Sequence, residues 1–334
     1  MDSLTQIVLG AAVGEATLGK RVGNKALFYG AVAGTIPDLD VIVGSFTDTI
    51  TAIEWHRGFS HSILFCVLLA PILGWLVNYI EGKSNVGWKA WTRLFFWCLL
   101  THPLLDLFTT WGTQLFWPLD YRFAFNSIFV IDPLYTVPFL ITTIWLMFYK
   151  KGSRKRWILN TTGILISTAY LMSTLIIKNV VTNKFESALD KQGINYTKIS
   201  TRPSPLNTVL WNANIDTKNR YYVGDYSFFD KNDTIRFIPY PKKRAASTHL
   251  LKYEGIQRLI KISNGWYVLQ KRKGHWYFND FRFGLIPQED GTEDFVFSYK
   301  IMEEGADISA FEVPKTNRDA KYLLETLWLR ITGI

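Results

Sequence analysis

Histidine and aspartate residues gather in three short motifs in the N-terminal half of this 334-residue chain. The motifs are Pro37-Asp38-Leu39-Asp40, His56-Arg57-Gly58-Phe59-Ser60-His61-Ser62 and Thr101-His102-Pro103-Leu104-Leu105-Asp106. They hold three of the five histidines, and His102 and Asp106 share one helix face because they stand at positions i and i+4. Imidazole nitrogens and carboxylate oxygens are ligands of zinc, manganese and iron. We therefore predict that two or three histidines and two or three aspartates hold a divalent metal ion, which would activate water at neutral pH.

Each motif alone also has a structural interpretation. A His–Asp pair on one helix can be purely structural, the Pro37–Asp40 motif can end one helix and cap the next, and Arg57 can anchor a loop at lipid headgroups. Asp132 before Pro133 is typical of a helix N-cap. Glu15 can be a further ligand or can join two helices, whereas His249 and His275 read as surface or packing residues. The order of the motifs and their common side of the membrane favour the metal site.

The motifs stand in or beside apolar runs long enough to cross a membrane. Three runs have no charged residue over their whole length, and a fourth is apolar except for a few polar residues, chiefly His102 and Asp106. The runs are 63–80, 94–111, 133–149 and 157–177, preceded by two weaker ones at 4–19 and 26–43. The weaker pair contains Gly10-x-x-x-Gly14 and Gly30-x-x-x-Gly34, a spacing that lets helices approach closely. We predict six membrane helices and leave open whether the first two cross completely.

Basic loops predict the orientation of these helices. The link 150–156 has five positive charges and no acidic residue, and the loops 20–25 and 81–93 are also basic. By the positive-inside rule all three are cytoplasmic, which places 36–62, 111–132 and everything after about 178 on the other side. The histidine and aspartate motifs then collect towards the extracytoplasmic side. No Lys or Arg precedes the first apolar run, so we expect no cleavable signal peptide, and Ser3-Leu4-Thr5-Gln6 reads as a capping box.

Composition excludes several classes of protein. With 48% hydrophobic and 19% charged residues, the chain is not a disordered protein. Two cysteines, Cys66 and Cys98, exclude a disulfide-dense scaffold and a Cys-rich zinc module. The net charge of +9 raises the question of a nucleic-acid partner, but membrane orientation accounts for the largest basic cluster. We expect no nucleic acid partner.

The second half of the chain has a different character. Short runs rich in β-branched and aromatic residues, at 221–223, 235–238, 266–269 and 294–299, predict strands, and 270–274 predicts a turn before 275–278. Residues 320–331 predict a closing amphipathic helix. The expected fold is an α-helical multi-pass membrane domain over 1–178 followed by a smaller antiparallel β-rich extracytoplasmic domain over 179–334.

The ordered motifs carry a resemblance to a known family. The opening Met1-Asp2-Ser3-Leu4-Thr5-Gln6, the run 30–34 leading into Pro37–Asp40, and the motifs at 56–62 and 101–106 resemble the YdjM-like family of bacterial inner-membrane-associated proteins. The resemblance covers about residues 1–180 and leaves out the β-rich half. It implies a predicted metal-dependent hydrolase of the bacterial inner membrane. It also implies metal ligands at Asp38, His56, His61, His102 and Asp106.

The leading functional hypothesis is a membrane-embedded metal-dependent hydrolase. Metal-activated water would attack an ester or phosphoester, with zinc as the first choice of metal and manganese or iron as alternatives. Asp40 would be a further ligand or the general base, and Arg57 would stabilise a phosphate-like transition state. A site at the membrane face points to membrane lipids as partners and to a lipid or lipid-linked substrate. The rival hypothesis is a non-enzymatic membrane protein with a structural metal site or a transported ion, whose β domain docks a partner.

Overall fold

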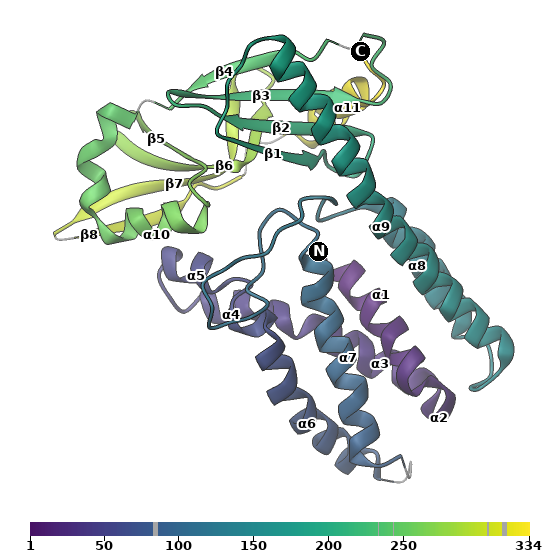
Figure 1. Ribbon diagram of the computed structural model, residues 1–334. Coiled ribbons are helices and arrows are strands. Elements are labelled where there is room, and N and C mark those ends of the chain that lie inside the picture. Colours follow the sequence, from purple (N-terminus) through teal and green to yellow (C-terminus); the bar gives the residue numbers. More distant parts are fainter. Residues whose placement is uncertain (83–85, 233, 243, 306, 316–318) are drawn as a thin grey trace. The chain divides into compact units, whose positions relative to one another are not determined.

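Two compact units make up the chain in the computed structural model (Figure 1), which describes residues 1–82, 86–232, 234–242, 244–305, 307–315 and 319–334. The first unit comprises 1–42, 55–176 and 205–207, and the second comprises 43–54, 177–204 and 208–334. The main division falls close to the predicted boundary after residue 178. Lys83, which belongs to the predicted 81–93 loop, lies outside the described residues.

Helices build the first unit, close to the six predicted positions. They are α1 (Ser3–Gly14), a π-helix (Glu15–Gly19), α2 (Lys20–Val22), α3 (Asn24–Thr35), α6 (Ile63–Ile80), α7 (Trp88–Asp106), α8 (Pro133–Leu146) and α9 (Arg154–Lys191). Among the described residues, three helical segments are long and apolar enough to cross a membrane: Asn24–Gly44, Ile63–Ile80 and Arg154–Lys191. Of the other segments, α8 is shorter and α7 carries charged and histidine side chains.

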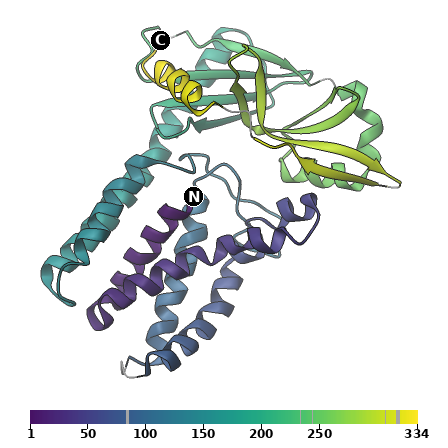
Figure 2. The same cartoon turned by 180° about the vertical axis from the view of Figure 1, so that it is seen from behind.

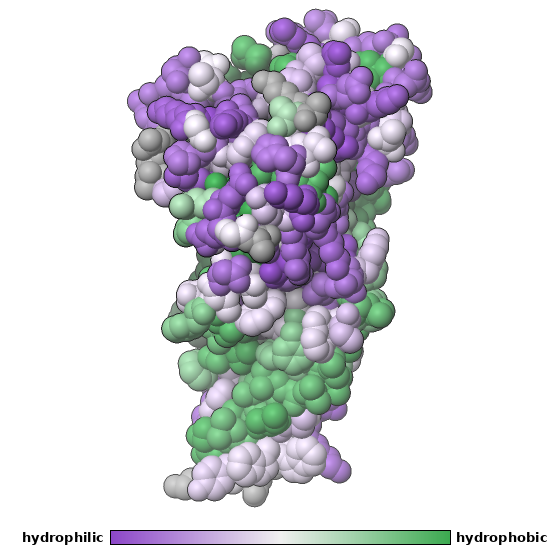
Figure 3. Space-filling view, turned by 90° about the vertical axis from the view of Figure 1, so that its left-hand side faces the viewer, coloured by the Kyte–Doolittle hydropathy of each residue, from purple (hydrophilic) through white to green (hydrophobic). Residues whose placement is uncertain are grey.

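The exposed faces of these helices carry many large apolar side chains. On α6, Leu68, Ile72 and Trp75 are all more than half exposed. Figure 3 shows hydrophobic side chains covering the helical part of the molecule on the face drawn there. A helical surface that exposes large apolar side chains is suited to lipid, where exposure costs nothing.

Glycines allow α1 and α3 to pack backbone against backbone. A Cβ atom on Gly10 would collide with the carbonyl oxygen of Gly30, and one on Gly30 would collide with the carbonyl oxygen of Gly10. Gly14 meets the Ala26 carbonyl in the same way. The structure therefore confirms the predicted role of the two glycine pairs. Close contact of the two helices brings the start of α1 and the end of α3 to the same place.

The start of α1 differs from the predicted capping box. Asp2, not Ser3, is the N-cap, because its carboxylate accepts the Thr5 backbone N–H at 3.1 Å. Gln6, which was expected to close the box, turns away from the helix terminus and is fully buried. Its amide donates to Asp106 on α7 at 3.1 Å, so a tertiary contact outweighs the local cap.

Glu15 joins two helices. Both of its carboxylate oxygens accept hydrogen bonds from the Arg156 guanidinium of α9, at 2.7 and 2.6 Å, and both side chains are buried. This bidentate pair neutralises two charges that would be costly to bury separately. Of the two roles considered for Glu15, ligand and helix link, the structure shows the second.

Antiparallel strands build most of the second unit (Figure 2). The sheet β1-β2-β3-β4 comprises β1 (Lys198–Pro203), β2 (Leu210–Asp216), β3 (Arg220–Ser227) and β4 (Phe237–Pro241). The sheet β5-β6-β7-β8 comprises β5 (Tyr267–Arg272), β6 (His275–Pro287), β7 (Glu293–Glu304) and β8 (Asp307–Glu312). The helices after the first strand are α10 (Glu254–Ile262) and α11 (Ala320–Ile331), and a 3-10 segment spans Arg244–Lys252.

These elements confirm the antiparallel character of the second half and the position of the last helix. The predicted strand at 235–238 begins later, at Phe237, and the strands of the predicted β-rich domain form two separate sheets. Each sheet has its own core, one around Trp211 and Phe185 of α9, the other around Phe278 and Tyr299. Residues 43–54 join this unit because α5 (Thr49–Trp55) inserts Ile50 into the second of these cores.

Candidate metal centre

The polar side chains of the motifs lie where helices of the first unit begin or end. Pro37 follows the end of α3 and starts a short 3-10 helix (Pro37–Leu39) that carries Asp38. A second 3-10 helix (Phe59–His61) ends on His61, directly before Ser62 caps α6 by accepting the Phe65 N–H. His102 and Asp106 lie in the last two turns of α7. Residues far apart in the sequence therefore meet where four helical segments begin or end.

Four of these side chains converge on one point. The Nε2 atoms of His61 and His102 are 3.2 Å apart. The Asp38 Oδ1 atom lies 3.3 and 3.4 Å from those two nitrogens, and the Asp106 Oδ2 atom lies 3.4 and 3.6 Å from them. All four atoms lie within 4.8 Å of one another. Five of the six separations are therefore 3.2–3.6 Å, and the sixth, between the two carboxylate oxygens, is within 4.8 Å. For comparison, the centre of a tetrahedron with edges of about 3.4 Å is about 2.1 Å from each corner, which is the usual length of a Zn–N or Zn–O bond.

Hydrogen bonds hold both imidazoles with Nε2 directed to that centre. His102 Nδ1 lies 2.6 Å from the Gly34 carbonyl oxygen, which can only accept, so Nδ1 carries the proton and Nε2 has a free lone pair. His61 Nδ1 lies 2.9 Å from Ser60 Oγ, and that hydroxyl lies 3.3 Å from Asp40 Oδ2. Partners of this kind orient histidine ligands in metal sites.

Asp106 is held from several sides. Its Oδ1 atom accepts from Gln6 Nε2 and contacts the Met1 amino group, and Arg57 Nε lies 3.2 Å from Oδ2. The Oδ2 atom is nevertheless buried without a hydrogen bond in the part of the chain that the structure describes. A fully buried carboxylate oxygen that lacks a hydrogen bond and faces two imidazole nitrogens is suited to a cation.

Arg57 lies behind the cluster rather than in it. Its side chain is buried, its Nη1 donates to Thr109 Oγ1 at 2.6 Å, and its backbone has a positive φ of 57°. Such a backbone is costly for a residue with a side chain and is found where the surroundings enforce it. The guanidinium predicted to face a phosphate is thus engaged with Asp106 and Thr109.

His56 and Asp40 form a second pair beside the four converging residues. His56 Nδ1 lies 3.2 Å from Asp40 Oδ1, and the Arg57 backbone N–H donates to Asp40 Oδ2 at 2.8 Å. Burial lowers the pKa of His56, although Asp40 opposes that shift, so the neutral imidazole is favoured at neutral pH. Of the five predicted ligands, the structure brings together Asp38, His61, His102 and Asp106, and it places His56 beside them, on Asp40.

Other residues named from the sequence lie elsewhere. Asp132 caps α8, accepting from the Leu134 N–H at 2.9 Å, and also accepts from the Tyr170 hydroxyl at 2.9 Å, which confirms its predicted N-cap role. His249 packs against Trp276 in the second unit, and His275 begins β6. Sequence reasoning missed Gln6 and Ser60 as supports of the cluster. The sequence did hold a signal for each of them. Gln6 is a polar side chain within an apolar run, and Ser60 stands directly before His61.

The cluster reaches the surface at Asp38. Its side chain is 26% exposed, whereas those of His61, His102 and Asp106 are fully buried. Leu39 and Phe59, which flank the cluster in sequence, are exposed, and Phe59 packs edge-to-face on Trp117. The residues present fit a divalent ion: two imidazoles and two carboxylates converge on one point, which is a donor set for zinc, manganese or iron rather than for calcium or magnesium.

Comparison with known proteins places the helical unit in a family. The family model described as YdjM inner membrane protein matches residues 1–181. The chain belongs to the YdjM inner membrane protein family. A relative, inner membrane protein YbcI of Escherichia coli (strain K12), is 28% identical over 114 residues, which are 34% of this chain and 64% of the relative. The match thus spans less than two thirds of that relative's length, and no solved structure matches the chain.

The YdjM match contains the whole candidate metal centre. All residues of the cluster, together with Gln6, Asp40 and Arg57, lie within 1–181. Both β-sheets lie outside the matched range, because β1 begins at Lys198. The metal cluster therefore belongs to the YdjM part of the chain, and both sheets lie beyond that part.

Proposed function

We propose that this YdjM family protein is a membrane-embedded, metal-dependent hydrolase that cleaves an ester or phosphoester. The observation that carries the proposal is the convergence of four atoms, with five of their six separations at 3.2–3.6 Å: His61 Nε2, His102 Nε2, Asp38 Oδ1 and Asp106 Oδ2. Zinc suits this donor set and spacing best, with manganese or iron as alternatives. When bound, such an ion supplies Lewis acidity and lowers the pKa of water.

The residues around the cluster would transfer protons or hold the metal ligands in position. His56, partly exposed and oriented by Asp40, is placed to take up or release a proton at its Nε2 atom. Arg57 and Gln6 keep Asp106 in position. Asp40 acts through His56 and, by way of Ser60, through His61. The proposed roles thus separate metal holding from proton transfer.

The surroundings of Asp38 support a lipid or lipid-linked substrate. Access to the cluster is from the partly exposed Asp38, and exposed apolar side chains, Leu39 and Phe59 among them, stand near it in sequence. The irregular segment after α7 exposes Phe116, Leu119 and Tyr121, and its Leu115 carbonyl accepts from the Ile63 N–H at the start of α6. If α6 crosses the membrane, these aromatic and apolar side chains lie at the interface, where such residues are favoured.

A structural metal site is the second candidate. Four protein ligands complete a tetrahedron, and closed four-ligand sites are typical of structural zinc, whereas catalytic zinc has three protein ligands and an open position. The partly exposed Asp38 is the ligand whose displacement would open the site. The two candidates differ in whether an outside anion can reach the metal.

Cobalt substitution distinguishes these candidates. The purified full chain is loaded with Co²⁺, whose visible absorption reports coordination, and is titrated with inorganic phosphate. In parallel, the zinc-loaded chain is assayed against phosphomonoesters, phosphodiesters, carboxylic esters and phospholipids. We expect phosphate to change the cobalt spectrum and at least one substrate to be cleaved. A spectrum indifferent to phosphate together with no cleavage would identify a structural site.

We further propose that the metal centre faces the extracytoplasmic side of the inner membrane. The support is the charge of the 20–25 and 150–156 loops, which favours a cytoplasmic position for both. Reporter fusions after residues 153 and 200 test this orientation. After residue 153 we expect activity only from a reporter that works in the cytoplasm. After residue 200 we expect activity only from a reporter that works outside the cytoplasm. A cytoplasmic reporter active at residue 200 would reverse the orientation.

A further inference from the structure

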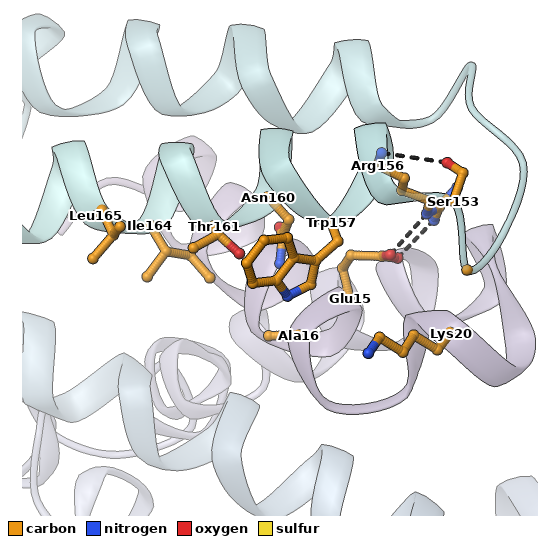
Figure 4. Close-up of a pocket in the computed structure, with 11 residues that line it drawn as sticks. Glu15, Ala16, Lys20, Ser153, Arg156, Trp157, Asn160, Thr161, Ile164 and Leu165 are labelled. Carbon is orange, nitrogen blue, oxygen red and sulfur yellow. Dashed lines mark hydrogen bonds and ion pairs between the residues drawn. The ribbon is translucent and has the colours of Figure 1, made fainter.

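A pocket of about 160 Å³ lies between the end of the first helical segment and the start of α9 (Figure 4). Glu15, Lys20, Ser153 and Arg156 supply its polar lining, and its apolar lining includes Trp157, Ile164 and Leu165. Lys20 is fourteen residues beyond Gln6, or about 20 Å along a helix axis, so the pocket and the metal cluster lie at opposite ends of that helical segment. The pocket is thus separate from the site already described.

The charges in the pocket leave one cation without a partner. Both Glu15 oxygens are engaged by Arg156, and Arg156 Nη1 also donates to Asn24 Oδ1 at 2.7 Å. The Lys20 ammonium forms no ion pair or hydrogen bond within the described part of the chain. In Figure 4 it points along the pocket towards the side of Ala16 and Trp157. The neutralised Glu15–Arg156 pair and the free Lys20 together give the polar end one net positive charge.

A buried acceptor in the same lining also lacks a partner. Asn160 is only 4% exposed, and its amide nitrogen donates to the Ala12 carbonyl at 3.0 Å. Its Oδ1 atom receives no hydrogen bond from any described residue. A buried carbonyl oxygen without a donor is costly and favours a ligand that brings a hydroxyl. The pocket therefore offers a cation for an anionic group and an acceptor for a hydroxyl.

The apolar end of the pocket continues along a candidate membrane helix. Trp157 and Leu165 are more than half exposed, and α9 is long and apolar enough to span a membrane. A tryptophan one turn inside a membrane helix is typical of the interface between headgroups and acyl chains. The basic residues of the 20–25 and 150–156 loops surround the polar end in sequence. A polar, cationic end followed by an exposed apolar strip matches an amphipathic anion.

We propose that this pocket binds an anionic phospholipid whose headgroup carries hydroxyls. The phosphate would meet Lys20, a headgroup or glycerol hydroxyl would donate to Asn160 Oδ1, and an acyl chain would lie along Trp157, Ile164 and Leu165. Basic pockets between membrane helices are suited to such headgroups. The lipid would also tie α9 to the α1–α2 segment, beside the buried Glu15–Arg156 pair. The proposal is independent of metal binding and of hydrolysis.

Lipid retention by the full chain tests the proposal. The protein in detergent is mixed with phosphatidylglycerol, with phosphatidylcholine or with inorganic phosphate, and bound adducts are measured by native mass spectrometry. Wild type is compared with Lys20→Gln and with Lys150→Gln, a matched control because Lys150 is an exposed lysine of the neighbouring basic link outside the pocket lining. Ala16→Phe is a second variant that fills the pocket without changing charge.

We expect wild type and Lys150→Gln to retain phosphatidylglycerol in preference to phosphatidylcholine. Lys20→Gln should weaken phosphatidylglycerol binding about fivefold, the factor for one basic side chain at an anionic headgroup. Ala16→Phe should weaken it at least as much. Equal retention of both lipids, equal behaviour of the two glutamine variants, or binding of inorganic phosphate alone would each overturn the proposal.

Discussion

Replacement of His102 by alanine is expected to remove the metal ion from the protein. His102 Nε2 lies 3.2 to 3.6 Å from the other three converging atoms, and the Gly34 carbonyl fixes its orientation. Mutation of a residue that hydrogen-bonds to a metal ligand lowers metal affinity about 10–100-fold, and loss of the ligand itself should lower it further. The measurement is metal content of the purified full chain by mass spectrometry, after dialysis against a chelator of known affinity.

Two further variants make the His102 result decisive. His249→Ala, which removes a histidine of the second unit, should leave the metal content unchanged. Because His102 is fully buried and its loss leaves a cavity, Asp38→Asn serves as a variant of nearly equal shape at the partly exposed ligand. We expect the same loss of metal there. Full metal content in both His102→Ala and Asp38→Asn would refute the site.

Replacement of His56 by alanine is expected to have a different effect, loss of hydrolysis with the metal retained. His56 contacts Asp40 rather than the four converging atoms, and it is partly exposed beside them. A positioned proton carrier contributes about 10²–10⁴-fold to a rate, so kcat should fall by that factor on whichever substrate the screen identifies. Rate and metal content are measured on the same preparation.

A variant of the neighbouring Asp40 is measured alongside His56→Ala. Asp40→Asn keeps the shape of the side chain but weakens its hold on His56, so we expect a smaller loss of kcat with the metal still bound. Metal that disappears with His56→Ala would show instead that His56 is a fifth ligand, as the family resemblance implies. Unchanged kcat in both variants would exclude the proposed proton transfer.

Short-range patterns in the sequence predicted much of the helical unit. The apolar runs marked α6 and α9, because length and composition decide whether a segment can cross a membrane. The glycine pairs of α1 and α3 predicted a close helix contact, because backbone approach needs side chains of minimal size. Asp132 before Pro133 predicted the start of α8 from the local chemistry of capping. Strand pairing in the second unit is non-local, and the sequence therefore indicated antiparallel strands without their separation into two sheets.

The tertiary structure decided which polar residues meet. Residue types in the motifs were enough to predict a site of histidine and aspartate, and the i, i+4 spacing put His102 and Asp106 on one face. No local rule states whether His56 or His61 faces Asp38, or whether Gln6 caps its own helix or supports Asp106. Those outcomes depend on where the ends of α1, α3 and α7 come together, and that position is set by packing between segments far apart in the chain. The sequence by itself therefore determined the types of donor, histidine and aspartate, and the motifs that carry them. Only the folded arrangement separated the four converging atoms from the residues that hold them.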